Sequence, residues 1–225
     1  MRNLKFYFCV AIVATVFLNS CSKKCDKNDL NSECYAPATD PAITDAGVVI
    51  NNVKWATFNI DKPGIFAAAP KIAGMFYQWN KKIGWTPSET MQNSNGSEEW
   101  DTTNPEGTEW TKANDPCPQG WRVPKIKELE ALLDSTKVKS EWTTQNSING
   151  RKFTDKISNN SIFLPAVGYR YYNGGTLYDV GSFGYYWSNA QYDEPRARCF
   201  GFGSSNVYTD SSYRRNGFSV RCVAE

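Results

Sequence analysis

The most constraining feature of the chain is a short apolar run close to its start. Two basic residues precede an uncharged run over residues 6–18, and this is the layout of a secretory signal peptide. The run is shorter than the about 20 apolar residues that a membrane-spanning helix needs. We therefore expect residues 1–20 to be a signal peptide and the remainder to fold outside the cytoplasm, where cysteines form disulfides.

The signal ends in a cysteine rather than in a small-residue cleavage site. Residues 18–21 read Leu-Asn-Ser-Cys, which resembles the bacterial lipobox, in which the cysteine is acylated and becomes the mature N-terminus. This predicts a lipoprotein that carries acyl chains such as palmitate on Cys21. We expect it to be anchored to the outer membrane at the cell surface, with the periplasmic face as the alternative. The other interpretation is an ordinary signal peptide with a chance cysteine.

Charge and hydropathy narrow the class of partner. The 225 residues include 25 Lys and Arg and 23 Asp and Glu, and removal of the two basic residues of the signal leaves 23 of each. A nucleic-acid-binding protein needs a basic face to neutralise phosphates, so we expect no nucleic-acid partner. The mean hydropathy of −0.54 predicts no second membrane segment.

The chain has no histidine. This absence excludes Ser-His-Asp and Cys-His nucleophile systems, His-ligated zinc and histidine general bases. Enzymes that use only carboxylates, lysine or tyrosine remain compatible with the composition, but no pair of acids stands out from ordinary surface charge. We therefore expect a protein that is not an enzyme and has no cofactor.

Residues 21–46 are polar and predict a flexible tether between the lipid and a folded domain. Cys25 and Cys34 lie close together within this tether, and in an oxidising compartment we expect them to close a small disulfide loop. Order is expected to begin at Gly47, so the folded domain is predicted to span residues 47–225.

The folded part alternates short strand patterns with long polar loops. The clearest helix signal covers residues 124–135, where a proline suits the first turn and one face is apolar. That face carries Ile126, Leu129, Leu132 and Leu133. Strand patterns cover residues 48–50, 53–60, 162–164, 184–188, 197–202 and 218–223. The predicted class is α+β, with long loops over residues 86–115.

Four segments stand out in a fixed order. They are residues 114–124 (NDPCPQGWRVP), 163–170 (FLPAVGYR), 184–189 (GYYWSN) and 216–223 (NGFSVRCV), with 53–59 (VKWATFN) and 77–80 (YQWN) upstream. Together they resemble the Fibrobacter succinogenes major paralogous domain, which is common in lipoproteins and surface proteins of the Bacteroidetes group. The resemblance covers about residues 47–223.

The resemblance implies a C-type-lectin-like fold. In that fold the chain ends come together, a helix packs on a twisted antiparallel sheet of short strands, and long loops fill one side. The resemblance also implies a disulfide between Cys117 and Cys222. Cys199 is then left over in a strand-like context, where we expect a buried free thiol; a reactive or metal-binding cysteine is the alternative.

Three arginines lie beside these motifs. We expect Arg122, Arg170 and Arg221 to donate buried hydrogen bonds to carboxylates or carbonyls and so to serve the scaffold. Trp121 and Trp187 are expected in the core. Sugar-binding C-type lectins hold calcium with related triplets, and residues 194–196 (EPR) and 187–189 (WSN) echo them, but the order is reversed and a carboxylate is missing. We therefore expect no metal site, with calcium as the alternative.

A binding surface is the remaining functional signal. Between residues 169 and 214 the chain alternates Tyr, Asn, Asp, Ser, Gly and Arg, which is the composition of adaptable binding surfaces. The predicted ligand-binding residues are Tyr171, Tyr172, Asn173, Asp179, Asn189, Tyr192, Asp193, Asn206, Tyr208, Asp210, Tyr213 and Arg214. The alternative is a set of solvated loops in which the tyrosines pack sideways.

These observations predict a membrane-anchored surface lipoprotein with a non-catalytic domain that binds a protein or a glycan. Its setting could be a surface assembly such as a pilus tip or a polysaccharide-capture system. The two alternatives are a carboxylate-based hydrolase that acts on surface glycans and a purely structural fimbrial or adhesin subunit.

Overall fold

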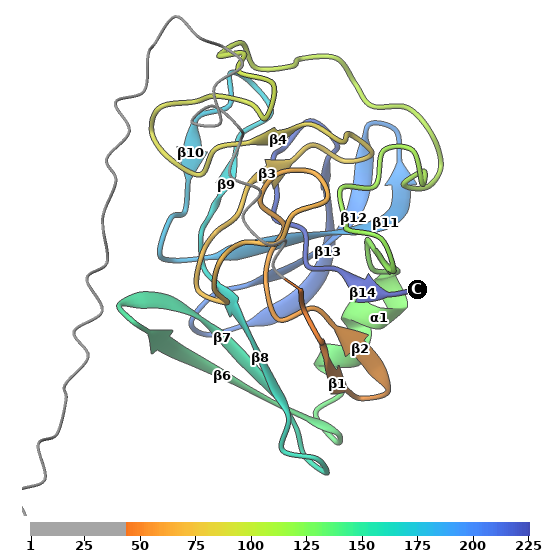
Figure 1. Ribbon diagram of the computed structural model, residues 1–225, viewed down its shortest axis with the longest axis vertical. Coiled ribbons are helices and arrows are strands. Elements are labelled where there is room, and N and C mark those ends of the chain that lie inside the picture. Colours follow the sequence, from red (N-terminus) through yellow and green to blue (C-terminus); the bar gives the residue numbers. More distant parts are fainter. Residues whose placement is uncertain (1–43) are drawn as a thin grey trace, which may run out of the picture. The chain divides into compact units, whose positions relative to one another are not determined.

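The two ends of the described chain meet in one small sheet (Figure 1). The computed structural model describes residues 44–225. The hairpin β1 (Val48–Ile50) and β2 (Val53–Trp55) turns through Asn51 and Asn52, which both have positive φ. The C-terminal β14 (Val223–Ala224) pairs with β2 on one side and with β5 (Trp121–Arg122) on the other, in the order β1-β2-β14-β5.

The other named strands form four more antiparallel sheets. They are β3 (Phe76–Tyr77) with β4 (Gly84–Trp85); β6 (Val138–Gln145), β7 (Ile148–Asp155) and β8 (Ser161–Pro165); β9 (Tyr169–Arg170) with β10 (Leu177–Tyr178); and β11 (Gly184–Asp193), β12 (Arg196–Phe202) and β13 (Val207–Tyr213). One short helix, α1 (Ile126–Glu130), runs into the 3-10 helix η2 (Ala131–Leu133). The class is therefore α+β, built from small antiparallel sheets.

The helix is shorter than the predicted 124–135. Lys125 is still extended, with φ −70° and ψ 154°, and its backbone N–H donates to the Glu128 carboxylate at 2.7 Å. The helix therefore begins at Ile126 rather than at residue 124. At the other end the Asp134 carboxylate accepts from the backbone N–H of Thr136 at 3.0 Å, which turns the chain toward β6. Leu129 and Leu132 are buried, as the apolar face predicted.

The strand predictions also need correction, and the predicted strand over residues 53–60 ends at Trp55 as β2. The β6–β7 hairpin was missed, because its residues are mostly polar and the positive-φ pair Asn146 and Ser147 is not a strong turn signal. The predicted strand over residues 218–223 is mostly extended chain that pairs through isolated bridges, such as Tyr77 with Phe218, and regular pairing starts only at Val223.

The β11–β12–β13 sheet lies between two apolar clusters. Tyr186, Phe200 and Phe202 face one cluster, which also holds Leu129, Phe153 and Leu164 from α1, β7 and β8. Trp187, Ala197 and Cys199 face the other, which also holds Trp79, Trp110, Phe218 and Cys222. Because successive side chains of a strand point to opposite faces, one sheet can organise both clusters. Trp187 is fully buried as predicted, whereas Trp121 is only half-buried.

The three predicted scaffold arginines donate as expected. Arg221 donates to Asn59 Oδ1 (3.0 Å), Ala56 O (3.2 Å) and Phe163 O (3.1 Å). Arg170 donates to the carbonyls of Thr86 (2.8 Å), Ser88 (2.5 Å) and Gly175 (2.5 Å). Arg122 instead forms a two-pronged ion pair with Glu128, at 2.6 and 2.8 Å. Arg170 and Arg221 thus donate hydrogen bonds to backbone carbonyl groups, most of which lie outside the strands.

A disulfide joins Cys117 to Cys222 across a sequence separation of 105 residues, with the Cα atoms 6.1 Å apart. Closing a loop of this length stabilises the fold by about 4–5 kcal/mol on the chain-entropy argument. Cys199 is a free, buried thiol, and burial raises its pKa to about 12.

Asp45 is hydrogen-bonded to the folded domain. Asp45, assigned to the tether, accepts hydrogen bonds from the backbone N–H groups of Gly47 (2.8 Å) and Phe58 (3.2 Å) and from Thr57. The predicted signal peptide (1–20), Cys21 and the Cys25–Cys34 pair lie outside the described residues.

Asp155 provides a pH-dependent tie between two turns. Its carboxylate accepts from the backbone N–H groups of Ser158 (2.9 Å), Asn51 (2.8 Å) and Ile157 (2.9 Å), and these bonds lower its pKa to about 2. A lowered folded-state pKa stabilises the protein fully above the unfolded value of about 3.9, and this contribution is lost as the pH falls toward 2. D155N should therefore lower the thermal midpoint at pH 6 by a few degrees. Calorimetry should show the difference from wild type shrinking below pH 4, and an equal difference at pH 2 and pH 6 would contradict the assignment.

Candidate functional site

Six tyrosines form a continuous line of neighbouring rings, here called the tyrosine strip. In spatial order they are Tyr213, Tyr172, Tyr171, Tyr178, Tyr169 and Tyr185. Successive ring centroids are 4.7, 4.4, 5.5, 5.9 and 5.1 Å apart. These are contact distances for aromatic pairs, so the rings form one connected surface feature.

Two sheets and the turn between β9 and β10 place the rings of the strip. In the β9–β10 pair, Tyr169 lies directly opposite Tyr178, so their side chains emerge on the same face. The turn between these strands carries Tyr171 and Tyr172, and the backbone N–H of Tyr172 donates to Asn216 Oδ1 at 2.7 Å. Tyr213 is the last residue of β13 and Tyr185 lies in β11, so both ends of the strip belong to the β11–β12–β13 sheet (Figure 1).

One end of the strip rests on the core and the other is open to solvent. The rings of Tyr169 and Tyr185 lie 5.6 and 5.1 Å from Phe218, which is buried. Tyr178 and Tyr213 are 47% and 43% exposed. The strip is thus held from beneath while it presents aromatic surface and phenol groups to the solvent.

The phenols of Tyr171 and Tyr185 stay protonated at neutral pH. Burial, followed by the hydrogen bond from its hydroxyl to Asp179 (2.9 Å), raises the pKa of Tyr185. The neighbouring Tyr172 side chain raises the pKa of Tyr171 to about 12. These hydroxyls can therefore both donate and accept hydrogen bonds to a ligand.

Arginines flank the solvent-exposed end of the strip. Arg215 Cζ lies 5.2 Å from the centre of the Tyr172 ring, and its Nη1 donates to Thr102 O at 3.0 Å. Next to Tyr213, the Cζ atoms of Arg196 and Arg198 lie 4.8 and 4.4 Å from the centre of the Tyr192 ring. These distances are typical of cation–π contacts.

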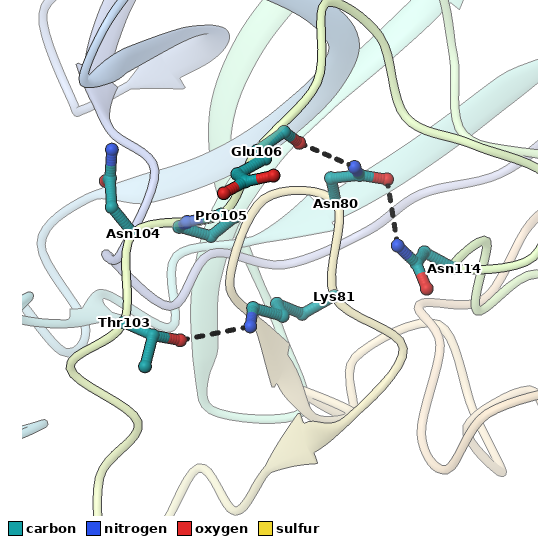
Figure 2. Close-up of a pocket in the computed structure, with 7 residues that line it drawn as sticks. All are labelled: Asn80, Lys81, Thr103, Asn104, Pro105, Glu106 and Asn114. Atoms are coloured by element: carbon teal, nitrogen blue, oxygen red, sulfur yellow. Dashed lines mark hydrogen bonds between the residues drawn. The ribbon is translucent and has the colours of Figure 1, made fainter.

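A polar pocket of about 450 Å³ lies nearby in the loops. It is lined by Asn80, Lys81, Thr103, Asn104, Pro105, Glu106 and Asn114. Figure 2 shows Lys81 reaching toward Thr103, with Nζ 3.2 Å from Oγ1, while the Asn80 amide lies between Glu106 O (2.8 Å) and the Asn114 amide (3.3 Å). This lining of amides, a hydroxyl and one ammonium suits a hydroxyl-rich ligand better than an apolar one.

The pocket and the strip share the loop of residues 101–106. Thr103 and Pro105 line the pocket, while Thr102 O accepts from Arg215, which packs on the strip. The same loop is held from below by Arg214, which donates to Pro105 O at 3.0 Å. The two features are therefore connected through one short segment.

Comparison with known proteins gives the family. The family model described as the Fibrobacter succinogenes major domain matches residues 48–224. The chain belongs to this family. The match confirms the resemblance seen in the motifs and covers almost the whole described part of the chain. No curated protein and no solved structure matches the chain significantly.

In this Fibrobacter succinogenes major domain, the predicted ligand-binding residues divide into groups. The strip holds Tyr171, Tyr172 and Tyr213, with Asp179 bonded to Tyr185 at its other end. Tyr192 and Asp193 lie beside Arg196 at the end of β11. The remainder are spread over the turn between β9 and β10, the loop before β13 and β13 itself, and they are Asn173, Asn206, Tyr208 and Asp210.

Two predicted contacts do not belong to this surface. Arg214 has no exposed surface; its guanidinium packs 4.6 Å from the Trp79 ring and also donates to Gln191 Oε1 at 3.1 Å. The prediction of a ligand contact there is corrected to a scaffold role. The backbone N–H of Asn189 donates to Pro124 O and its carbonyl accepts from the Trp110 N–H, so this residue lies in another region of the domain.

Sequence reasoning missed part of the surface. Tyr185 is not among the predicted ligand-binding residues, although its ring belongs to the strip. Arg215 and the pocket residues Lys81 and Thr103 carried no periodic signal, because they lie in loops whose spacing is set by tertiary contacts. A surface arginine next to a buried one, as in residues 214–215, is not distinguishable by residue type.

The structure supplies no metal cluster and no membrane helix in its described part. Within residues 44–225, no group of three or more His, Cys, Asp or Glu side chains is arranged to hold a metal ion. None of the helices in this range has the length and hydropathy needed to cross a bilayer. The expected absence of a metal or cofactor stays a prediction.

The adjacent arginines 214 and 215 allow a matched test of the scaffold. R214Q should lower the free energy of unfolding by about 3 kcal/mol, because it removes a buried charged donor from several carbonyls. R215Q should change it by about 0.5 kcal/mol or less, because that side chain lies at the surface. Urea titrations of both variants measure the difference, and equal effects would contradict the assigned roles.

Proposed function

We propose that this protein is a membrane-anchored lipoprotein of the outer membrane, exposed at the cell surface, with a non-catalytic domain that binds a protein or glycan ligand. The observation that carries the proposal is the tyrosine strip. Six adjacent rings form one aromatic surface, in which Tyr169 and Tyr185 pack on the core while Tyr178 and Tyr213 are exposed to solvent. Contiguous exposed aromatic surface is typical of binding sites.

The chemistry of the strip favours recognition over catalysis. Tyrosine offers a large rigid contact area with a polar hydroxyl, at a low cost in side-chain entropy. The neighbouring pocket adds amides, a hydroxyl and Lys81, but only one carboxylate, Glu106. A carboxylate-based glycoside hydrolase needs two carboxylates across the scissile bond. A ligand held along the strip with a polar end in the pocket would use both features.

We further propose a C-type-lectin-like fold for residues 47–225, after a signal peptide (1–20) and a polar tether (21–46). Three observations support this fold. The ends of the domain pair in one sheet through β2 and β14, the Cys117–Cys222 bond ties the region before α1 to the last strand, and long loops connect the sheets.

Lipid anchorage rests on the lipobox at residues 18–21. Radiolabelled palmitate should label the wild-type protein in the membrane fraction, and C21S should remain unlabelled and uncleaved. Because single acyl chains give only marginal membrane binding, several chains on one cysteine are expected to be needed for stable anchorage. Wild-type protein that keeps its leader and takes up no label would refute the anchor.

Ligand binding by the strip is tested with arrays of glycans and of surface proteins, probed with the purified full chain. Y172A and Y213A should each weaken binding to any captured ligand by roughly tenfold, because each removes a ring from the line. I157A is the matched control, since Ile157 is 89% exposed and lies in the turn held by Asp155.

Three results would overturn this proposal. Unchanged affinity in both tyrosine variants would remove the strip as the site. Turnover of an arrayed sugar that a single Asp or Glu substitution abolishes would favour the hydrolase. Absence of any ligand, together with incorporation of the protein into isolated fimbriae, would favour a structural subunit.

A further inference from the structure

Two arginines beside the strip lack a carboxylate partner. In the part of the chain that the structure describes, no carboxylate oxygen lies within ion-pair distance of Arg198 or Arg215. The nearby acids are occupied otherwise. Asp193 pairs with Arg196 at 2.5 Å, Glu194 lies 3.9 Å from the buried Arg214, and Asp101 lies 3.2 Å from Lys81. The exposed end of the strip therefore carries two uncompensated positive charges.

The same two guanidinium groups are held in place by aromatic rings. Arg198 Cζ lies 4.4 Å from the centre of the Tyr192 ring, and Arg215 Cζ lies 5.2 Å from the centre of the Tyr172 ring. Thr102 O fixes Arg215 further by accepting from its Nη1 at 3.0 Å. A charged group that is already ordered loses less entropy when it binds an anion.

The strand register places Arg198 near Tyr213, and Arg215 follows two residues after Tyr213 in the chain. Arg196 lies opposite Tyr213 and Arg198 lies opposite Ser211. The side chains of Arg196 and Arg198 therefore share one face of the β11–β12–β13 sheet. Arg215 follows Tyr213 in the chain and stacks on Tyr172, the next ring of the strip. Asp210 lies opposite Cys199 on the other face of the sheet, so it does not neutralise this surface.

We propose that this surface binds an acidic polysaccharide, with Arg198 and Arg215 holding carboxylate or sulfate groups and the tyrosine strip packing on the sugar rings. A guanidinium group binds either anion with two parallel hydrogen bonds. Sugar rings offer flat C–H faces to the tyrosines and hydroxyls to their phenols. The inference rests on the proposed function and names the ligand class of the same site.

An acidic peptide fits the surface less well than a polysaccharide. Stable protein interfaces bury about 1,200–2,000 Å² and concentrate their energy in anchors that fill pockets. The pocket next to the strip is polar, with amides and a hydroxyl in its lining, and suits sugar hydroxyls rather than an apolar anchor. Nucleic acid would need a wider basic face than two free arginines provide.

The test compares polysaccharides that share one backbone. The purified full chain is titrated with dextran, carboxymethyl-dextran and dextran sulfate of equal length by biolayer interferometry at 0.15 M salt, which screens weak surface attraction. The expected result is at least tenfold tighter binding of one or both acidic polymers than of dextran. R198Q and R215Q should each reduce that binding at least fivefold.

The control variant is K127Q, which removes one positive charge from an exposed lysine of α1. It should change binding less than twofold, whereas an equal loss in K127Q would show unspecific ion exchange and refute the site. Circular dichroism and urea titration establish that the arginine variants fold. Equal binding of all three polymers would refute the proposal that the ligand is acidic, but it would leave the proposed glycan-binding function in place. Binding of an acidic polypeptide but of no polysaccharide would also refute the acidic-polysaccharide proposal. If no ligand of any class binds, the proposed binding function is refuted as well.

Discussion

The fold depends on buried guanidinium groups that donate to backbone carbonyls. Arg170, Arg214 and Arg221 are each at most 2% exposed, and their hydrogen bonds go mainly to backbone carbonyl oxygens of loops and strands. Because the chain has many long loops and short strands, numerous backbone groups lack sheet partners and must be satisfied otherwise. One arginine carries five donors in a fixed fork and can fasten several loop segments at once. A buried charge without its partners is costly, so these loops are constrained to a single arrangement.

The same scaffold positions the proposed binding surface. Arg170 joins the segment of residues 86–88 to Gly175, in the turn that carries Tyr171 and Tyr172. Arg214 fastens Pro105 beneath the pocket, while its neighbour Arg215 stacks on Tyr172 at the surface. Of these two consecutive residues, Arg214 stabilises the interior and Arg215 contributes to the binding surface. The strip is expected to be rigid before a ligand arrives, and a preorganised surface binds with a smaller loss of conformational entropy.

Short sequence motifs made the scaffold predictable, but they did not predict much of the candidate binding surface. The family motifs identified the domain, and the positions of Arg170 and Arg221 beside them indicated buried hydrogen bonding. The apolar face of the helix was visible, but its length was not, because the capping by Glu128 and Asp134 depends on local geometry. Tyrosine-rich composition indicated a binding face, yet contacts between residues as distant as Tyr172 and Tyr213 decide which rings meet. Composition also could not separate the buried Arg214 from the partly exposed Arg215.

Hydrogen–deuterium exchange of the full chain, with and without its bound ligand, tests most directly whether the strip is the binding surface. We expect slower amide exchange on binding in residues 169–178 and 207–215, which carry most of the strip, and in the loop of residues 101–106 that links it to the pocket. The β6–β7 hairpin should show no change, because it contributes no ring to the strip. Protection confined to that hairpin or to α1, with residues 169–178 unaffected, would contradict the account.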